Sequence, residues 1–383
     1  MRILHTIPGR NWGGMEHRTL EQVRWLHANG HAVWLAAPAD GEPYHRAERM
    51  GLPVVRMSFD PPWRPATVGA LRRFVRDNGV EVIDAHVTRD AKAAMACLDL
   101  CAVVRSRHVN QPLKATIIRR LQWRFGADHV ITVAEVTRRD LVATGLAAAA
   151  RSTSIGGWAD EAFFQLADAE TTRARLRAEQ ELAAESTVVL CVGMLRPDKG
   201  QDHLIRALGL LAGRGLALDC LLAGSATAES APYQAALERL AVDQGLGGRV
   251  RFLGYREDVS NLMQAADLVV IPSLTEAQPR VAVQAFATGR PVVATRVGGV
   301  PEIVTDGVTG WLVPPADPSA LAEAIGRALS DSAAAATVAA NARRLAEGEM
   351  RFDHRMAQTL ATYRTAMERA RRRVFPRFRG VAG

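Results

Sequence analysis

The amino-acid sequence predicts an α/β protein with two doubly wound parallel sheets. Short apolar runs typical of strands, such as 32–38, 52–57 and 80–86, alternate with helix-like segments at 43–50 and 66–77. The same alternation returns in the second half of the chain, and it is typical of βαβ units. The length of 383 residues suggests two domains, each with a hydrophobic core of its own.

Composition and charge narrow the class of protein. Hydrophobic residues make up 48% and charged residues 23% of the chain, as in soluble globular proteins. No stretch approaches ~20 consecutive apolar residues, so we expect no transmembrane helix, and the first strand, at 2–7, does not resemble a signal peptide. The net charge of +8 favours nucleotide phosphates, acidic lipids, phosphorylated glycans or nucleic acid as partners. The cysteines lack metal-ligand and disulfide spacing, which favours a reducing compartment; they are Cys97, Cys101, Cys191 and Cys220.

The stretch 271–304 carries the strongest functional pattern. A strand-like run leads to a loop with Glu276, and a helix then leads to a second strand and the turn Gly298-Gly299. Ligands of parallel sheets bind beyond the carboxyl ends of the strands, where both loops lie. We therefore expect two helix N-termini, one after each loop, to converge on an anion. An ordinary structural unit with an exposed loop glutamate is the alternative.

Another glycine pair, Gly13-Gly14, follows the first strand. Glycine lets a ligand approach the backbone closely, so this pair, placed before a helix at 16–28, suits a phosphate or a sugar. It lacks the G-x-G-x-x-G spacing and the later acidic residue of a dinucleotide site. Glu16 either orients a substrate hydroxyl or is a first-turn acid that the helix dipole favours.

Two histidines end neighbouring strands. His86 ends the strand at 80–86, with Arg89 just beyond it, and His108 ends the strand at 102–108. Each is either a structural side chain or a ligand contact, because imidazole both donates and accepts hydrogen bonds near neutral pH.

A basic loop, MLRPDKG, opens the second half of the chain between a strand at 187–193 and a helix that starts near Gln201. Its Arg196 and Lys199, with backbone N–H groups beside them, suit a diphosphate. A solvated pair of loop charges is the alternative. The remaining strands and the last helix are expected at 129–135, 217–224, 249–254, 266–273, 310–318 and 351–373.

Two basic segments suggest a surface partner. The segment 114–126 places apolar side chains on one side of a helix between basic flanks, which suits either an anionic membrane surface or a solvated domain helix. The tail RRRVFPRFRG at 371–380 either contacts an anionic membrane or is simply a basic end of the chain.

The stretch around Glu276 resembles the nucleotide-sugar signature of the family-4 retaining glycosyltransferases of the GT-B fold. The resemblance lies in Glu276, the small-residue helix after it, G-R-P-V-V-A and G-G-V-P-E, and it covers about thirty residues. One position departs from the signature, because Gln284 stands where a second glutamate is usual. The resemblance implies a GT-B architecture, with two Rossmann-like doubly wound parallel-sheet domains facing a cleft. These domains are expected at 1–165 and 166–350, and 351–383 is expected to be a helix that crosses back to the first domain, followed by the basic tail.

The resemblance also assigns roles to single residues. It implies that Lys199 and Arg196 neutralise the leaving diphosphate. It implies that Glu276 holds hydroxyls of the donor sugar and that His108 approaches the transferred sugar, and these four are the expected catalytic residues. No metal and no cofactor is expected, because the family needs no metal on an Asp-x-Asp motif and this chain has no such motif. The other donor-binding positions are Gly13, Gly14, Gly254, Tyr255, Arg256, Ala277, Gln278, Pro279, Arg280, Gln284, Gly298 and Gly299, and the acceptor-side positions are Glu16, His86 and Arg89.

The function that the resemblance implies is retaining transfer of a sugar from a nucleotide diphosphate sugar to a glycan or glycolipid. The strings VVRSRHVNQPLK and EAQPRV are similar to members that build bacterial surface polysaccharide such as lipopolysaccharide. This places the protein in the cytoplasm, at the inner face of the membrane, with no nucleic-acid partner. The alternatives are a sugar-nucleotide epimerase, a small-molecule glycosyltransferase and a non-catalytic GT-B scaffold with a degenerate donor site. Gln284 keeps an acceptor oxygen but lacks the charge of glutamate, so weaker or retuned nucleotide binding is expected; neither the base, among UDP, GDP and ADP, nor the acceptor follows from the sequence.

Overall fold

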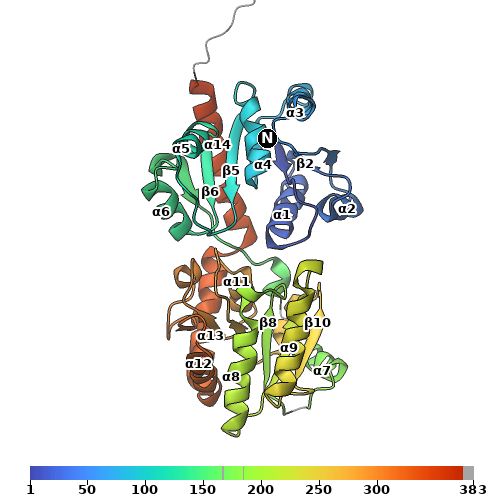
Figure 1. The fold of residues 1–383 in the computed structure, drawn as a ribbon, viewed down its shortest axis with the longest axis vertical. Coiled ribbons are helices and arrows are strands. Elements are labelled where there is room, and N and C mark those ends of the chain that lie inside the picture. The colour runs from blue at the N-terminus through green and yellow to red at the C-terminus, as the bar shows by residue number, and fades with distance from the viewer. Residues whose placement is uncertain (166–167, 184, 374–383) are drawn as a thin grey trace, which may run out of the picture. The chain divides into compact units, whose positions relative to one another are not determined.

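The computed structural model describes residues 1–165, 168–183 and 185–373. Tertiary contacts divide the chain into two compact units. The first unit comprises 1–155 and the chain from Met356 onward, and the second comprises 156–355. Each unit is a parallel sheet with helices packed around it (Figure 1). Most of the predicted basic tail lies outside the described residues.

The first unit is built on a seven-stranded sheet in the order β3-β2-β1-β4-β5-β6-β7. Every strand pair in it is parallel, which confirms the predicted doubly wound sheet. The last strand was not predicted, because its Ser-Thr-Ser sequence is polar and it lies at the edge of the sheet. The strands are β1 (Arg2–Thr6), β2 (Ala32–Ala37), β3 (Val54–Arg56), β4 (Val82–Ala85), β5 (Ala102–Arg107), β6 (His129–Thr132) and β7 (Ser152–Ser154).

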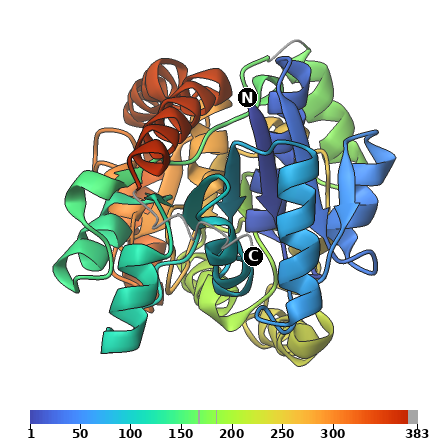
Figure 2. The ribbon, with the colours of Figure 1, turned by 90° about the horizontal axis from the view of Figure 1, so that it is seen from above.

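Helices cover both faces of this sheet, as Figure 2 shows from above. The last helix joins the first unit from Met356 onward. Its Tyr363 is fully buried and donates a hydrogen bond to Asp84 Oδ2 over 2.6 Å. The helices are α1 (Gly14–Ala28), α2 (Glu42–Arg49), α3 (Pro65–Asp77), α4 (Thr88–Ala94), α5 (Ile117–Phe125), α6 (Glu135–Ala143) and α14 (Phe352–Arg372).

The second unit has a six-stranded parallel sheet in the order β10-β9-β8-β11-β12-β13. Its central strands are almost continuous Val and Leu runs, because helices bury both faces of a parallel sheet. The strands are β8 (Val188–Val192), β9 (Asp219–Ala223), β10 (Val250–Gly254), β11 (Leu268–Ile271), β12 (Val292–Thr295) and β13 (Trp311–Val313). The helices are α7 (Ala169–Glu179), α8 (Gln201–Gly213), α9 (Ala231–Asp243), α10 (Val259–Ala265), α11 (Arg280–Ala287), α12 (Pro318–Ser330) and α13 (Ser332–Glu349).

Both sheets reverse their strand order at one point. The chain builds outward from β1 in one direction and then continues from β4 in the other, and β8 and β11 are related in the same way. The carboxyl ends of strands at such a switch point form the usual ligand-binding crevice of open α/β sheets. The predicted residues His86, Lys199 and Glu276 all follow strands at these points. Among the described helices, none combines the length and the apolar character that a membrane span requires.

Candidate functional site

An ion pair joins two strand ends in the second unit. Lys199 Nζ lies 2.5 Å from Glu276 Oε1, and the hydroxyl of Ser273 donates to the same oxygen over 2.9 Å. Lys199 ends a short turn after β8, whereas Ser273 and Glu276 follow β11. The two loops are also tied by their backbones, since the N–H of Leu274 donates to the carbonyl of Asp198 over 2.8 Å. Two of the predicted catalytic residues are therefore brought together.

Gly200 is the residue that allows this close approach. Its φ is +66°, and a Cβ at this position would lie 2.1 Å from the carbonyl oxygen of Pro272. Only glycine combines that conformation with that space. Helix α8 begins at the next residue. Arg196, at the other end of the turn, is half exposed and pairs with Asp198 over 2.8 Å, so in this structure its charge is met within its own loop.

The loop that carries Glu276 is held from two sides. Ala277 accepts a hydrogen bond from the N–H of Gly299 over 2.8 Å, which joins the two predicted loops. The side chain of Gln278 accepts a hydrogen bond from the N–H of Gly157. Pro279 is the N-cap of α11, and Arg280 is its first residue.

One predicted feature of these loops is wrong. The segment after Gly298-Gly299 forms only the three-residue 3-10 turn Val300–Glu302, not a helix whose N-terminus could attract an anion. A bridge between Asp306 and Gly310 begins after only three further residues and leads into β13, which leaves little room for a longer helix. Gly298 itself adopts a φ of +49°, as a tight turn requires.

Three of the predicted donor-binding residues lie at the end of β10, of which Gly254 is the last residue. Gly254 adopts a φ of +65°, and Tyr255 is about half exposed. Arg256 pairs with Asp258 over 2.7 Å and with Glu179 over 3.0 Å, and these carboxylates raise its pKa. Its donors are thus engaged within the unit. Gln284, the position of the departure from the signature, is half-buried on α11.

Three histidines are joined in the first unit. His5 lies in β1, while His86 and His108 follow β4 and β5. His5 Nδ1 lies 2.9 Å from His86 Nε2, and His86 Nδ1 lies 2.9 Å from His108 Nε2. The structure thus places both predicted histidines in one network and adds His5, which the sequence did not indicate.

Burial keeps these imidazoles neutral. It lowers the pKa of His5 and of His86 to about 3, and it lowers the pKa of His108 well below the usual value. Asp84 is the register partner of His5 on β4, and burial raises its pKa. Arg18 is buried nearby and further lowers the pKa of His86.

Asp90 fixes the strand end that carries His86. Its Oδ2 accepts hydrogen bonds from the N–H of His86 and the hydroxyl of Thr6, each over 2.8 Å, and its Oδ1 accepts from the N–H of Val87 over 2.9 Å. Burial raises the pKa of Asp90 to about 7, although these hydrogen bonds act to lower it. The carboxyl group therefore holds the turn into α4 rather than a ligand.

The other predicted residues of the first unit surround the start of α1. Gly13 is the N-cap and Gly14 the first helical residue; a Cβ at Gly14 would meet nothing within 4 Å, so packing alone does not require glycine there. Burial raises the pKa of Glu16. Arg89 pairs with Asp60 over 3.2 Å and is not joined to the histidine network.

Sequence reasoning missed the partners that hold these groups. His5 and Asp84 lie inside strands, and Ser273 lies at a strand end. The one available signal was a titratable residue in a strand expected to be buried on both faces, since such a group needs a partner.

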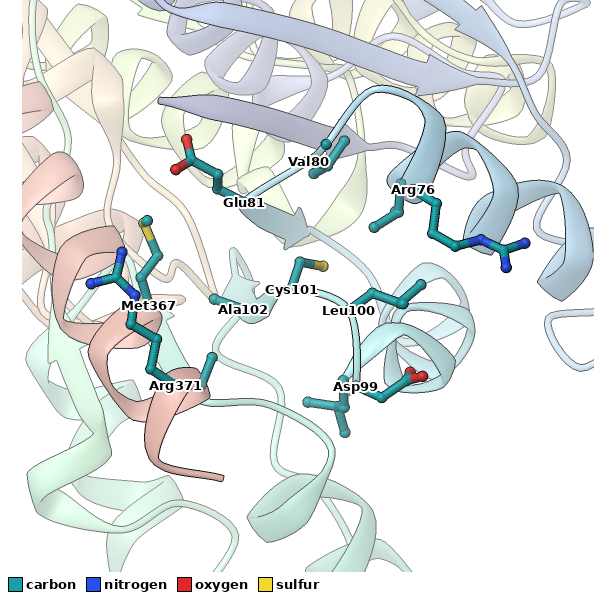
Figure 3. A pocket seen from close by; sticks show the side chains of 13 residues that line it. Arg76, Val80, Glu81, Asp99, Leu100, Cys101, Ala102, Met367 and Arg371 are labelled. Carbon is teal, nitrogen blue, oxygen red and sulfur yellow. The ribbon is translucent and has the colours of Figure 1, made fainter. Parts of the chain in front are cut away.

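A cavity of about 450 Å³ lies elsewhere in the first unit (Figure 3). Its lining comes from α3, α14 and the beginnings of β4 and β5, and it includes Arg76, Glu81, Asp99 and Met367. It is found at the amino-terminal ends of the strands, whereas parallel sheets bind ligands at the other end. None of the predicted site residues is in its lining, so we do not assign the site to it.

Comparison with known families gives two matches. Residues 172–345 match the family model described as glycosyl transferases group 1. Residues 12–155 match the model described as Glycosyltransferase Family 4. The two matches fall on the second and the first unit, respectively.

Named relatives show the same likeness. A D-inositol 3-phosphate glycosyltransferase of Corynebacterium efficiens is 31% identical over 287 residues, which cover 70% of this chain and 67% of the relative. One of Mycolicibacterium paratuberculosis is 33% identical over 243 residues, or 63% of this chain and 53% of the relative. For several of these relatives, the matched part of the chain spans about half of their length.

Among solved structures, Anabaena Alr3699/HepE in complex with UDP and glucose is similar to the whole chain. The TM-score is 0.82 and the identity 27%, and the match covers 94% of this chain and 99% of that protein.

Proposed function

We propose that this chain, which belongs to the group 1 glycosyl transferases, moves a sugar from a nucleoside diphosphate to an acceptor hydroxyl. The observation that carries the proposal is the pairing of Lys199 with Glu276 at the ends of two neighbouring strands. A cation and a carboxylate at a switch point suit a donor that has an anionic diphosphate and a neutral sugar.

The donor that we propose is a UDP-sugar, because the Anabaena protein was solved with UDP and with UDP-glucose. Lys199, assisted by Arg196, would bind the phosphate oxygens of the diphosphate. Glu276 would accept hydrogen bonds from sugar hydroxyls, and the amide oxygen of Gln284 would accept one from the ribose. Tyr255, whose ring is about half exposed, offers a surface to the base.

The proposed reaction breaks the bond between the anomeric carbon and the diphosphate oxygen. The same carbon forms a bond to the acceptor oxygen, and the acceptor proton passes to the departing diphosphate. Negative charge grows on that diphosphate, and Lys199 is the group that would neutralise it. We propose attack from the face on which the diphosphate leaves, with retention at the anomeric carbon. We also propose that no metal ion is needed, because Lys199 supplies a cation.

The acceptor that we propose is a glycan or lipid at an anionic membrane surface, as in surface polysaccharide synthesis. The support is the α5 patch, which consists of Ile117, Ile118, Leu121 and Phe125, each more than half exposed. Large apolar side chains grouped on one helix are unusual at a free surface. The cations of Lys114, Arg119 and Arg124 lie in the same segment, as expected of a helix that rests on anionic lipid.

The α5 patch is held by a buried contact beneath it. Trp123 of α5 is only 4% exposed, and the guanidinium of Arg105 lies 4.1 Å from the centre of its ring. Because this contact fixes the helix on β5, the exposed apolar residues cannot turn inward. The helix thus presents them to a partner.

A second candidate acceptor is a soluble inositol phosphate. The names of the bacterial relatives favour it. Because the match covers only part of the length of these relatives, we offer an inositol phosphate acceptor for this chain as a second proposal.

The donor is tested by the melting temperature of the full chain with UDP, GDP or ADP, since a ligand of the native state raises it. UDP is expected to give the largest shift. Lys199→Ala is expected to lower UDP affinity at least tenfold and to abolish transfer. Arg206→Ala, which removes an exposed cation from α8, is the matched control and should change neither. Transfer should continue in EDTA.

Three results would contradict the proposal. No shift with any nucleotide, in a folded protein, would favour the non-catalytic scaffold. Conversion of the sugar nucleotide to an epimer without acceptor would favour the epimerase. Equal activity of Lys199→Ala and Arg206→Ala would remove the proposed role of Lys199.

The membrane acceptor is tested by co-sedimentation with vesicles. Phosphatidylglycerol vesicles should bind the protein and phosphatidylcholine vesicles should not. The double variant Ile117→Ser/Ile118→Ser should lose binding, whereas Val242→Ser, a matched change at an exposed residue of α9, should keep it. Absence of binding by the wild type, together with transfer to soluble inositol phosphate, would establish the second candidate.

A further inference from the structure

A row of side chains leads from the core of the first unit to His108. His108 is partly exposed at the outer end of the row, while His86 and His5 are buried behind it. Each link measures 2.9 Å between ring nitrogens. The three residues come from or directly follow β5, β4 and β1, which are neighbours in the sheet. The sheet itself therefore sets their spacing.

The two links cannot be oriented independently. A neutral imidazole carries a single N–H, and burial keeps all three rings neutral. His86 must then donate to one neighbour and accept from the other. Only two arrangements satisfy both links: either all three rings carry the proton on Nε2, or all three carry it on Nδ1.

The inner end of the row distinguishes the two arrangements. Within the described residues, His5 Nε2 and Asp84 Oδ1 are buried polar atoms without a formed hydrogen bond, although the nearby Ser106 hydroxyl acts to lower the pKa of the Asp84 carboxyl. A ring nitrogen of His5 and a carboxylate oxygen of Asp84 lie within 4.8 Å of one another. Tyr363 already donates to the other oxygen of Asp84, as expected of a carboxylate, which only accepts.

With the protons on Nε2, the unpaired nitrogen of His5 is a buried N–H in the field of the Asp84 carboxylate, whose negative charge acts on His5. With the protons on Nδ1, the same nitrogen of His5 would be a buried lone pair with no donor, in a site that also holds a carboxylate, which is costly. We propose that Asp84, His5 and His86 are positioning residues that hold His108 as its Nε2–H tautomer, with Nδ1 free to accept a hydrogen bond. A hydroxyl group is the ligand class that such an acceptor would bind. That this hydroxyl belongs to the sugar or the acceptor rests on the proposed function.

A metal ion is the competing occupant of this cluster, since His5, Asp84 and His86 could together offer ligands. Both nitrogens of His86 and Nδ1 of His5 already take part in the links. Only His5 Nε2 and Asp84 Oδ1 remain, and two ligands are too few for a structural zinc site. The hydrogen-bonded row of Asp84, His5, His86 and His108 therefore accounts for the cluster better than a metal ion does.

The direct test is the tautomer of His108 in the full chain, labelled with ¹⁵N-histidine and measured by two-bond ¹⁵N–¹H correlation. The His108→Gln variant assigns the signal. Protonated Nε2 and bare Nδ1 are expected. Protonated Nδ1 on His108, or an equimolar metal in protein purified without chelator, would overturn the proposal. This readout needs neither donor nor acceptor, so it stands even if transfer activity is never found.

A second test changes the inner end. In Asp84→Asn, the amide can donate to His5 Nε2 and drive all three protons to Nδ1. The His108 tautomer should switch, and kcat should fall roughly 10- to 100-fold, as for other groups that orient a functional side chain, with the KM for the donor unchanged. Tyr363→Phe should cause a smaller fall. Asp128→Asn, the same change at another buried aspartate, should leave the tautomer as it is. An unchanged His108 tautomer in a folded Asp84→Asn protein would refute the proposal that Asp84 sets the tautomer of His108.

Discussion

Gly200 offers a sharp test of how the turn that carries Lys199 is built. Alanine at this position would adopt a left-handed conformation, and its Cβ would lie 2.1 Å from the carbonyl oxygen of Pro272. Gly245 is a matched control in the same unit, because its φ is +70° and a Cβ there would meet nothing within 4 Å. The comparison of Gly200→Ala with Gly245→Ala therefore separates the backbone cost from the clash.

The magnitudes follow from these two terms. A left-handed alanine costs roughly 1–2 kcal/mol, and both variants share this cost. The clash at Gly200 cannot be relieved by a side chain, because the obstacle is backbone. Forced overpacking typically adds about 1–3 kcal/mol. We expect Gly245→Ala to lose roughly 1–2 kcal/mol of unfolding free energy and Gly200→Ala roughly 2–5 kcal/mol.

The assays are calorimetric. For a unit of this size, each kcal/mol lowers the melting temperature by about 2–4 °C. Displacing Gly200 also moves Lys199 away from Glu276, so isothermal titration should show at least a tenfold loss of UDP affinity in Gly200→Ala and none in Gly245→Ala. Equal melting temperatures and equal UDP affinities in the two variants would refute the reasoning.

Three further predictions concern charge. Glu276→Gln should tighten UDP binding, because Lys199 loses its internal partner, yet transfer should fall; weaker UDP binding in a titration would contradict this. Gln284→Glu should strengthen UDP binding by about fivefold, since hydrogen bonds to charged acceptors are stronger by about 1 kcal/mol; an unchanged Kd would show that this side chain does not meet the ribose. Burial lowers the pKa of His129 to about 4, so the unfolded chain takes up this proton first and the contribution of His129 to the free energy of unfolding should fall as pH drops from about 6.5 towards 4. Asp90, whose pKa is raised to about 7, contributes in the opposite direction. Urea unfolding of the wild type and of His129→Asn at pH 7 and pH 5 measures the contribution of His129, which the variant should lack.

The sheets were predictable because most of their central strands are buried on both faces. Such strands are unbroken apolar runs, and the runs ended within a few residues of the observed strands. The polar edge strand β7 carries no such signal. The segment after Gly299 was also misleading. Its Pro301 is typical of a first helical turn, but the chain forms only a 3-10 turn before it enters β13.

The site was predictable only where its residues follow strand ends in a recognisable string. Lys199 and Glu276 are 77 positions apart, yet each stands in such a string, and the structure pairs them. His5 stands in no string. Its neighbour Asp84 is brought to it only by the register of β1 and β4, and the register between distant strands depends on the whole fold. A long-range pairing of this kind leaves no local trace in the sequence.

We propose that the Lys199–Glu276 ion pair, which joins two loops, couples the binding of the two parts of the proposed donor. In this structure each charge compensates the other, so neither is left desolvated and unpaired, which would be costly. When a diphosphate arrives, Lys199 can exchange the carboxylate for phosphate oxygens. Glu276 would then be able to accept hydrogen bonds from the sugar hydroxyls, while the Ser273 hydroxyl still donates to one of its oxygens. On this proposal, recognition of the sugar would depend on recognition of the diphosphate, because the carboxylate could bind hydroxyls only after Lys199 had exchanged it for phosphate oxygens.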